Sequence, residues 1–338
     1  MSEGRAPTIY DVAAAAGVSH QTVSRMLRGH QGFRKETRAR VLEAIDTLGY
    51  RTNASARSLR TGSTGVIALA VPDLKQPYFA ELAEVIVDEA RAVDLSVFVE
   101  TTGGDADLEY AVFDRMRTQA VDGVLFAPKA IAADRLAALR LAIPMVILGD
   151  HILDQAFDHV TLPNREGAAA AVAHLLRTCR QRIAVFGAEP PENGGAAALR
   201  LAGYRDAHRA AGVRVDRRLL VATGEWERST GAEAMRRVLD DGLDFDAAFC
   251  ANDALAIGAL RVLLERGISV PGAVAVVGFD DTEDARFTFP SLTSVAPDYR
   301  GFVRSAIALL QRRIRAEEGA SEPADVVPGF ALRLRESS

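Results

Sequence analysis

The hydrophobic pattern changes once along the chain. Up to about residue 60, apolar residues recur three and four positions apart in short runs, as on one face of a helix. From residue 65 onward, short continuous apolar runs alternate with longer stretches of helical periodicity. Alternation of buried strands with helices is typical of doubly wound parallel sheets. The pattern therefore predicts a small all-α segment followed by a large α/β body.

Two short helices joined by a tight turn are predicted between Thr8 and Gly29. The first covers 9–16, and Gly17 follows where a helix needs a left-handed terminator. Ser19 precedes the second periodic run and is a favourable N-cap. This order is the plan of a helix-turn-helix, in which the second helix enters the DNA major groove. The alternative is a generic helical hairpin with a solvated polar face.

The outer face of the second helix carries side chains that can bond to base edges or phosphates: His20, Gln21, Ser24 and Arg25. A third helix is predicted from Lys35 to Leu48, ended by Gly49, and should complete a small core. The preceding Phe33-Arg34 offers no capping hydroxyl to this helix.

The α/β body contains too many predicted strands for one ordinary sheet. Strands are expected at 65–71, 95–100, 123–127, 143–148, 182–186, 247–250, 273–278 and 326–335, and helices at 79–93, 109–120, 167–178, 199–211 and 302–316. Two α/β lobes are therefore expected. Ligands of such sheets sit beyond the carboxyl ends of the strands, so two facing lobes predict a cleft there.

Polar residues follow the predicted strands at the positions where a cleft would lie. They occur in the loops 71–79, 149–151, 251–253 and 278–281. For any one loop the alternative is a helix N-cap, and this holds above all for Asp73, Asp253 and Asp281. Four such loops at matching positions favour a binding site.

Charge is distributed unevenly along the 338 residues. The net charge is −5, but residues 1–60 hold ten Arg and Lys against five Asp and Glu, so the remainder carries a net charge of −10. A basic head on an acidic body is typical of phosphate binding by one small module. There is no apolar run of membrane-spanning length and no signal-like N-terminus, so a cytoplasmic location is expected.

The sequence shows few residue patterns that are typical of enzymes or metal sites. Cys179 and Cys250 lack metal-ligand spacing and are expected to fill core space. No G-x-G-x-x-G follows the first predicted strand, and Gly103-Gly104 alone is too weak a signal for a nucleotide cofactor. We therefore expect no cofactor, no metal and no catalytic residues.

The motifs of the first 60 residues identify a family resemblance. The run from Asp11 to Arg25, DVAAAAGVSHQTVSR, resembles the DNA-binding headpiece of the lactose-repressor/galactose-repressor family of bacterial transcription regulators. The resemblance implies base contacts by His20, Gln21 and Arg25, and phosphate contacts by Thr8, Tyr10, Ser19, Thr22, Ser24 and Asn53. It also implies a hinge around 53–60 that becomes helical on DNA, with Leu59 and Ala56 at the bases and Leu59 as a minor-groove wedge.

The body also resembles this family, whose effector domain is similar to periplasmic sugar-binding proteins. The sequences that carry this resemblance are LRLAGY (199–204), GEW (224–226), ANDALAIGAL (251–260) and VVGFDDTED (276–284). The resemblance implies an effector site formed by Asp150, Arg200, Trp226, Asn252, Asp280, Tyr299 and Tyr78. The loop 76–79 is nearer the pattern of the wider family, which leaves the identity of the sugar open.

These observations predict a headpiece at 1–52, a hinge and linker at 53–64, and an effector-binding and dimerisation body at 65–338. The N-lobe would comprise about 65–164 and 297–325, and the C-lobe about 165–296 and 326–336. The expected function is a dimeric repressor of a pseudo-palindromic operator, released by a galactoside-like sugar. No tetramerising leucine-heptad tail follows the closing strand. The alternative is a purine or other corepressor that promotes DNA binding.

Overall fold

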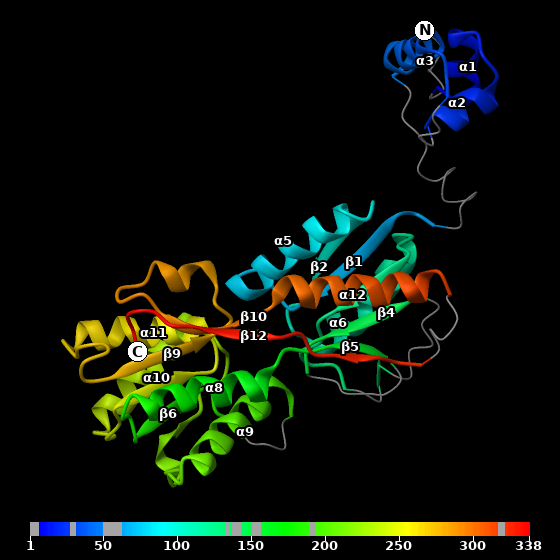
Figure 1. Cartoon of the computed structure of the whole chain (residues 1–338). Coiled ribbons are helices and arrows are strands. Elements are labelled where there is room, and N and C mark those ends of the chain that lie inside the picture. Colours follow the sequence, from blue (N-terminus) through cyan, green and yellow to red (C-terminus); the bar gives the residue numbers. More distant parts are fainter. Residues whose placement is uncertain are drawn as a thin grey trace. The chain divides into compact units, whose positions relative to one another are not determined.

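The computed structural model describes residues 7–27, 32–49, 63–132, 135–136, 143–150, 157–189, 194–316 and 322–338. The chain divides into two compact units, 1–64 and 65–338, shown in Figure 1. The predicted hinge residues Asn53, Ala56 and Leu59 lie outside the described residues.

The first unit is a bundle of three helices: α1 (Ile9–Ala16), α2 (His20–Leu27) and α3 (Lys35–Leu48). Thr8 and Asp11 form a capping box at the start of α1, and Gly17 ends it in the left-handed conformation with φ 62°. The inner faces of the helices form one small core: Val12, Ala13, Ala16, Val23, Val41 and Ala44. Helical periodicity and capping residues thus place three helices where the sequence predicts them.

The N-lobe of the second unit is a six-stranded sheet in the order β11-β5-β4-β3-β1-β2. Its elements are β1 (Val66–Val71), α5 (Pro77–Arg91), β2 (Ser96–Thr101), α6 (Ala106–Thr118), β3 (Gly123–Phe126), β4 (Met145–Leu148), β5 (Asp158–Val160), α12 (Tyr299–Ile314) and β11 (Asp325–Val326). All paired strands in this sheet run parallel.

The C-lobe sheet has the order β12-β10-β9-β8-β6-β7. Its elements are α8 (Asn164–Arg177), β6 (Ile183–Phe186), α9 (Gly195–Ala210), η2 (Arg217–Leu219), β7 (Leu220–Val221), α10 (Arg228–Asp240), β8 (Ala247–Cys250), α11 (Asp253–Glu265), β9 (Ala275–Phe279), η3 (Glu283–Arg286), β10 (Thr293–Pro297) and β12 (Phe330–Arg333). Strand β12 is the exception to the parallel order, since it pairs antiparallel with β10.

The closing stretch differs from its prediction. One strand was expected at 326–335, but β11 joins the N-lobe sheet and β12 joins the C-lobe sheet. Pro328 and Gly329 separate the two strands. Proline lacks the N–H that a sheet ladder needs, so it interrupts the strand where the chain passes between lobes.

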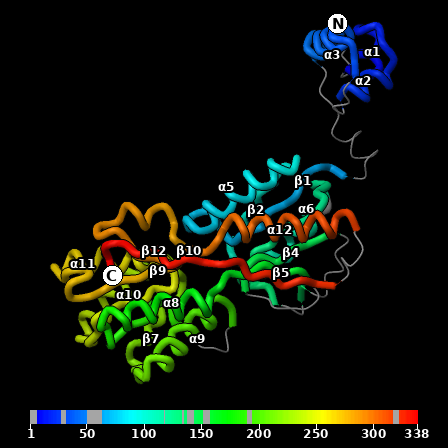
Figure 2. The backbone as a smooth tube through the Cα atoms, viewed as in Figure 1, coloured from blue at the N-terminus to red at the C-terminus, as the bar shows by residue number. Residues whose placement is uncertain are grey.

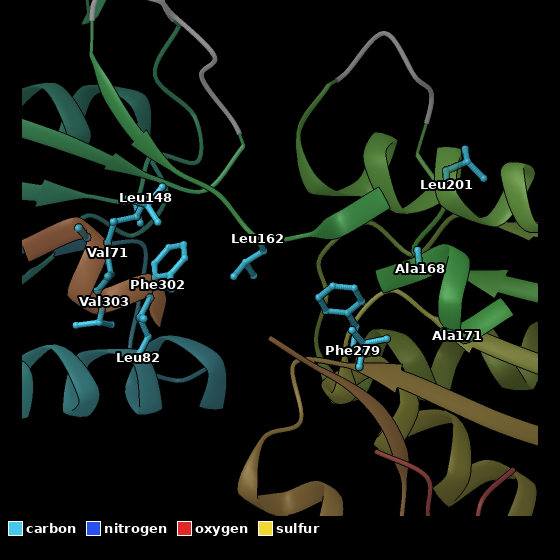
Figure 3. Packing of buried hydrophobic residues seen from close by; sticks show 14 of the residues in the cluster. Val71, Leu82, Leu148, Leu162, Ala168, Ala171, Leu201, Phe279, Phe302 and Val303 are labelled. Atoms are coloured by element: carbon cyan, nitrogen blue, oxygen red, sulfur yellow. The ribbon is translucent and has the colours of Figure 1, made fainter. Parts of the chain in front are cut away.

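The chain crosses between the lobes three times, as the tube in Figure 2 allows the reader to follow. The crossings lie between β5 and α8, between β10 and α12, and between β11 and β12. Buried apolar residues of both lobes form one continuous cluster, and Figure 3 shows Leu162 between its two halves. The lobes are therefore joined by covalent connections and by shared packing.

Two helix pairs in the C-lobe pack with their backbones unusually close. A Cβ added to Gly203 in α9 would lie 2.1 Å from the backbone oxygen of Arg165 in α8. A Cβ on Gly258 in α11 would lie 2.0 Å from the backbone oxygen of Arg228 in α10. Only glycine allows such an approach, so these two positions fix how each pair packs.

Candidate functional site

The predicted DNA-facing side chains of the first unit lie on the solvent side of α2. His20, Gln21 and Arg25 are exposed, while Thr22 and Ser24 are half-buried. The Tyr10 ring lies 5.1 Å from that of His20, centroid to centroid, so these two side chains share one surface. The Arg25 guanidinium lies 5.9 Å from the centre of the Phe33 ring. Among the described residues, α2 thus exposes the polar side chains His20, Gln21 and Arg25.

The hydroxyl groups at the ends of these helices also stabilise local structure. The Ser19 hydroxyl lies 2.9 Å from that of Thr22 and accepts a hydrogen bond from the Thr22 backbone N–H at 3.2 Å. The Thr8 hydroxyl donates to Asp11 at 2.7 Å. The N-cap residue of α3, Arg34, makes no side-chain capping hydrogen bond. These hydrogen bonds therefore stabilise the helix ends on which Thr8, Ser19 and Thr22 lie.

A cavity of about 630 Å³ lies between the two lobes of the second unit. Loops after β1, β3 and β4 line it from the N-lobe, and loops after β6, β8 and β9 line it from the C-lobe. This is the carboxyl-end position that parallel sheets offer to ligands. Six of the seven predicted effector residues line this cavity: Tyr78, Asp150, Arg200, Trp226, Asn252 and Asp280.

A buried polar network crosses the floor of the cavity. Asn164 donates its side-chain N–H to Asp150 and accepts from Arg200 Nε at 2.7 Å. Arg200 also donates to the backbone oxygen of Ala251, and its Nη2 lies 3.6 Å from Asp280 Oδ1. A buried charge needs such partners because the unpaired ion would lose its hydration without compensation. Arg200 thus connects the acidic groups of both lobes.

Arg200 is only 4% exposed, so it is not a surface charge on α9. Its guanidinium carbon lies 3.6 Å from the Phe279 ring centre and 5.2 Å from that of Trp226. The two rings flank a cation that also carries hydrogen bonds, which limits its rotamers. The guanidinium is therefore fixed before any ligand arrives.

Strand β9 ends in a backbone turn that separates two adjacent aspartates. Asp280 has φ 106° and Asp281 has φ 54°, both in a region that side chains rarely adopt. Asp280 lines the cavity, whereas Asp281 pairs with Arg335. The unusual backbone thus sends one carboxylate into the cavity and the next away from it.

The polar residues after β8 divide into a ligand-facing and a structural group. Asn252 caps α11 through the Leu255 N–H at 2.9 Å and donates to the Trp226 backbone oxygen at 3.2 Å. Asp253 is buried and accepts from Ser294 Oγ at 2.6 Å and from the Thr282 N–H at 2.8 Å. Asp253 therefore connects α11 with the loop after β9 and with β10 through buried hydrogen bonds, whereas Asn252 lines the cavity.

Burial raises the pKa of the two cavity carboxyls. The pKa of Asp280 rises to about 7, mainly through burial, while the Arg200 charge opposes the shift. Burial likewise raises the pKa of Asp150 to about 6, against the effects of Arg200 and the Asn164 hydrogen bond. The free-energy cost of removing water from each carboxylate exceeds the stabilisation of its charge by Arg200, so both pKa values rise. These groups would gain from ligand hydroxyls that donate to the charged form.

The aromatic residues of the cavity differ in their surroundings. Trp226 is half-buried, lines the cavity and also packs against the C-lobe core. Tyr78 lines the cavity and lies 5.8 Å from Tyr299, ring centre to ring centre. Tyr299 is outside the cavity lining, and its buried hydroxyl has no hydrogen-bond partner among the residues that the structure describes. The structure thus places Tyr299 beside the site rather than on its wall.

Two contacts join the lobes at the edge of the cavity. Lys129 of the N-lobe pairs with Glu225 of the C-lobe, and both residues line the cavity. The Glu81 carboxylate accepts from the Glu283 backbone N–H at 2.9 Å. Both contacts involve partly exposed groups, so each is expected to add little to the stability of the lobe arrangement.

Sequence reasoning missed Asn164, Lys129 and Glu189 as lining residues. Asn164 begins α8 and looks like an ordinary helix-start residue in the sequence. Its role depends on Arg200, which lies 36 positions later in the chain. The position of Lys129 after a strand was the one available signal, since Ala127-Pro128-Lys129 follows β3 just as the recognised loops follow their strands.

A three-helix head and a two-lobed body with an inter-lobe cavity define a class of regulator that couples DNA binding to a ligand. Residues 8–53 match the model of bacterial regulatory proteins of the lacI family, and residues 172–338 match a periplasmic binding protein-like domain. The chain belongs to the lacI family of bacterial regulatory proteins.

Relatives and solved structures support this assignment over nearly the full length. The chain is 36% identical to the HTH-type transcriptional regulator CelR of Thermobifida fusca, covering 100% of both chains. A solved CelR–cellobiose complex is 32% identical, with TM-score 0.72, covering 98% of this chain and 100% of the other. A Lac repressor dimer bound to operator and the anti-inducer ONPF is 25% identical, with TM-score 0.82, covering 98% of this chain and 99% of the other. Such relatives are transcription regulators, not enzymes.

A further solved structure is similar over most of the chain. A putative LacI-family transcriptional regulator from Sanguibacter keddieii is 46% identical, with TM-score 0.74, covering 81% of this chain and 98% of the other. Within the part of the chain that the structure describes, no helix is long and apolar enough to cross a membrane. In the same residues, no cluster of His, Cys, Asp and Glu could hold a metal ion.

Proposed function

We propose that this regulator is a dimeric repressor, released from its operator by a small sugar bound in the inter-lobe cavity. The observation that carries the proposal is the buried network Asp150–Asn164–Arg200–Asp280 on the cavity floor. It provides fixed acceptors and a fixed donor side by side, which is what vicinal hydroxyls require. Trp226 on the same wall offers an apolar face for a pyranose ring.

The size of the cavity supports a glycoside or a disaccharide as the effector. About 630 Å³ lies within the usual range for small-molecule sites. The CelR complex with cellobiose shows that a relative binds a disaccharide. A galactoside-like ligand would place one ring against Trp226 and Asp280, and the remainder toward Lys129 and Gln76.

A purine corepressor is the second candidate; a relative of 31% identity is the HTH-type transcriptional repressor PurR of Haemophilus influenzae. The carboxyls argue for the sugar. Asp150 and Asp280 with an ionised side chain can only accept hydrogen bonds, and every sugar hydroxyl donates one. The release of DNA by the ligand is part of the same proposal and rests on the analogy with sugar-binding relatives.

On the DNA side, we propose that His20, Gln21 and Arg25 read base edges and that Arg25 binds a guanine. Thr8, Tyr10, Ser19, Thr22, Ser24 and Asn53 would contact phosphates, while Leu59 and Ala56 act at the minor groove. The exposed face of α2 supports the first set. The sites on 53–60 rest on the sequence resemblance alone.

Dimer formation is proposed through the C-lobe. Phe287 is 79% exposed and Phe289 is 82% exposed, both between η3 and β10, and Leu264 on α11 is 57% exposed. Phe287 and Phe289 lie two residues apart, and contiguous exposed apolar side chains are typical of an interaction surface. A second copy of this chain is the expected partner, because two headpieces are needed for the two halves of an operator.

Intrinsic fluorescence tests the effector proposal directly, because Trp226 is the only tryptophan. Galactosides, glucosides, cellobiose, pentoses and purines are titrated into the full-length protein, and operator binding is then measured with the ligand that responds. We expect a saturable change with one sugar class and loss of operator binding in its presence. A response to purines alone, or sugar binding that strengthens operator binding, would contradict the proposal.

A further inference from the structure

A second cavity, of about 350 Å³, lies in the C-lobe away from the inter-lobe cleft. It is lined by the residues just before β6, by the loop that precedes β7, by the turn after α10 and by α9. These segments precede strands β6, β7 and β8, whereas the cleft lies where β6 and β8 end. The second cavity therefore opens at the amino-terminal edge of the same sheet, outside the site described above.

Most of the charges around this cavity are already paired. Arg182 lies 3.1 Å from Asp244, and Arg218 lies 2.6 Å from Asp216. Arg214 and Asp241 also line the cavity, and neither side chain has a hydrogen bond or ion pair within the described ranges. The cavity thus keeps one available cation and one available anion in its wall.

His208 adds a hydrogen-bond acceptor from the floor. The side chain is 2% exposed, and its Nδ1 lies 2.9 Å from the backbone oxygen of Tyr204. A carbonyl oxygen only accepts, so Nδ1 carries the proton and the neutral ring has its lone pair on Nε2. Burial lowers the pKa of His208, which keeps the ring neutral. No described residue hydrogen-bonds to Nε2, although the residue lines the cavity.

Helix α9 connects this cavity with the effector cleft. Arg200, Tyr204 and His208 are spaced by four residues, so they lie along one face of the helix. Arg200 serves the cleft, while Tyr204 and His208 line the second cavity. The Tyr204 hydroxyl donates to the Ile183 oxygen at 2.8 Å, which ties the helix to β6. A ligand in the second cavity would thus contact the helix that positions Arg200.

We propose that the second cavity binds a small zwitterion of the α-amino acid class. The carboxylate of the ligand pairs with Arg214, and its ammonium group donates to Asp241 and to His208 Nε2. A purely anionic or purely cationic ligand would satisfy one of the available charges and leave the other unpaired. The effector cleft is not required for this binding, so the second site gives the regulator an additional input.

Calorimetric titration of the full-length protein with each of the twenty standard amino acids at millimolar concentration tests the proposal. We expect at least one to bind with 1:1 stoichiometry, and its amine and carboxylic-acid analogues, each lacking one charge, to bind more weakly. Failure of every amino acid to bind would overturn the proposal. So would equal binding of an analogue that lacks one of the charges.

Exposed side chains provide variants that should fold normally. Arg214→Gln and Asp241→Asn should each weaken binding by at least about tenfold, which corresponds to about 1.4 kcal/mol. Arg217→Gln is the matched control, because Arg217 is exposed in the same segment but does not line the cavity. Wild-type affinity in both test variants, or equal loss in the control, would place the ligand elsewhere and refute the site.

Discussion

Arg200 and Asp280 lie 3.6 Å apart, Nη2 to Oδ1, and both side chains are almost completely buried. Arg200 also reaches Asn164 and Ala251, so one guanidinium holds the crossover at the start of α8 and the loop after β8. Because buried ion pairs stabilise only when all their hydrogen bonds are made, this arrangement is a poor device for stability alone. It is better explained as a site whose donors and acceptors are already in place for a ligand.

The planar guanidinium group of Arg200, with its fixed donor directions, should therefore contribute more to sugar binding than its positive charge alone. Arg200→Lys keeps the cation but loses the planar donors to Asn164 and Ala251. We expect sugar affinity to fall at least about tenfold, or about 1.4 kcal/mol, measured by Trp226 fluorescence. Arg209→Lys is the control, since Arg209 lies exposed on the same helix and pairs with Asp206. Unchanged affinity in Arg200→Lys would remove the planar guanidinium group from the binding site.

The raised pKa of Asp280 predicts how stability depends on pH. Burial raises that pKa to about 7, above the ordinary value of 3.8, so the folded state holds a proton that the unfolded state has released. The free energy of unfolding should therefore fall as pH rises from about 4 to about 7, by at most about 1.4 kcal/mol per pH unit for this group. Urea unfolding between these pH values measures the slope.

Asp280→Asn should flatten this pH dependence and also abolish the sugar response, because the amide cannot ionise. Burial also raises the pKa of Asp150 to about 6, so the free energy of unfolding of the variant should still fall with pH, but less steeply. Asp284→Asn is the control for an exposed carboxylate nearby. The same slope in Asp280→Asn and in the wild type would show that Asp280 ionises normally.

The proposed base and phosphate contacts of the headpiece predict two different effects of mutation on DNA binding. Arg25→Ala should lose discrimination at one base pair, at a cost of about 1–3 kcal/mol for the preferred sequence. Thr22→Val should weaken binding to all sequences alike, because a phosphate contact carries no sequence information. Operator sequences selected from a random pool by the wild type provide the substrate for both measurements. Full discrimination in Arg25→Ala would reassign the base contact.

The exposed phenylalanines predict the oligomeric state. Phe289→Asp should convert the dimer to a monomer at micromolar concentration, because a carboxylate cannot be buried unpaired in an apolar interface. Sedimentation velocity measures the change. Leu108→Asp, at a 48% exposed site on α6, is the control and should remain dimeric. A stable tetramer of the wild type, or a dimeric Phe289→Asp variant, would contradict the proposed interface.

The close approach of α8 and α9 predicts a large effect of one methyl group. Gly203→Ala would place its Cβ 2.1 Å from the Arg165 backbone oxygen, so the helices must separate. We expect a loss of about 1–3 kcal/mol in the free energy of unfolding, together with weaker sugar binding because α9 carries Arg200. Gly329→Ala has open space around the added methyl group and should be nearly neutral. Equal stability of both variants would refute this account of the packing.

Features that depend on neighbouring residues could be predicted from the sequence. Apolar periodicity, the Ser19 cap and Gly17 predicted the headpiece helices, since these depend on residues within one or two turns of each other. The alternation of apolar runs with helical patterns predicted the two α/β lobes for the same reason. Motif resemblance then singled out seven effector residues, six of which line one cavity.

Contacts between residues far apart in the chain could not be predicted in this way. Asn164 meets Arg200, Lys129 meets Glu225, and β11 and β12 join different sheets. The second cavity likewise gathers residues from four segments that are far apart in the sequence. Hydrophobic periodicity carries no information about such contacts. They depend on how helices and sheets pack and on which buried charged groups need a hydrogen-bond partner.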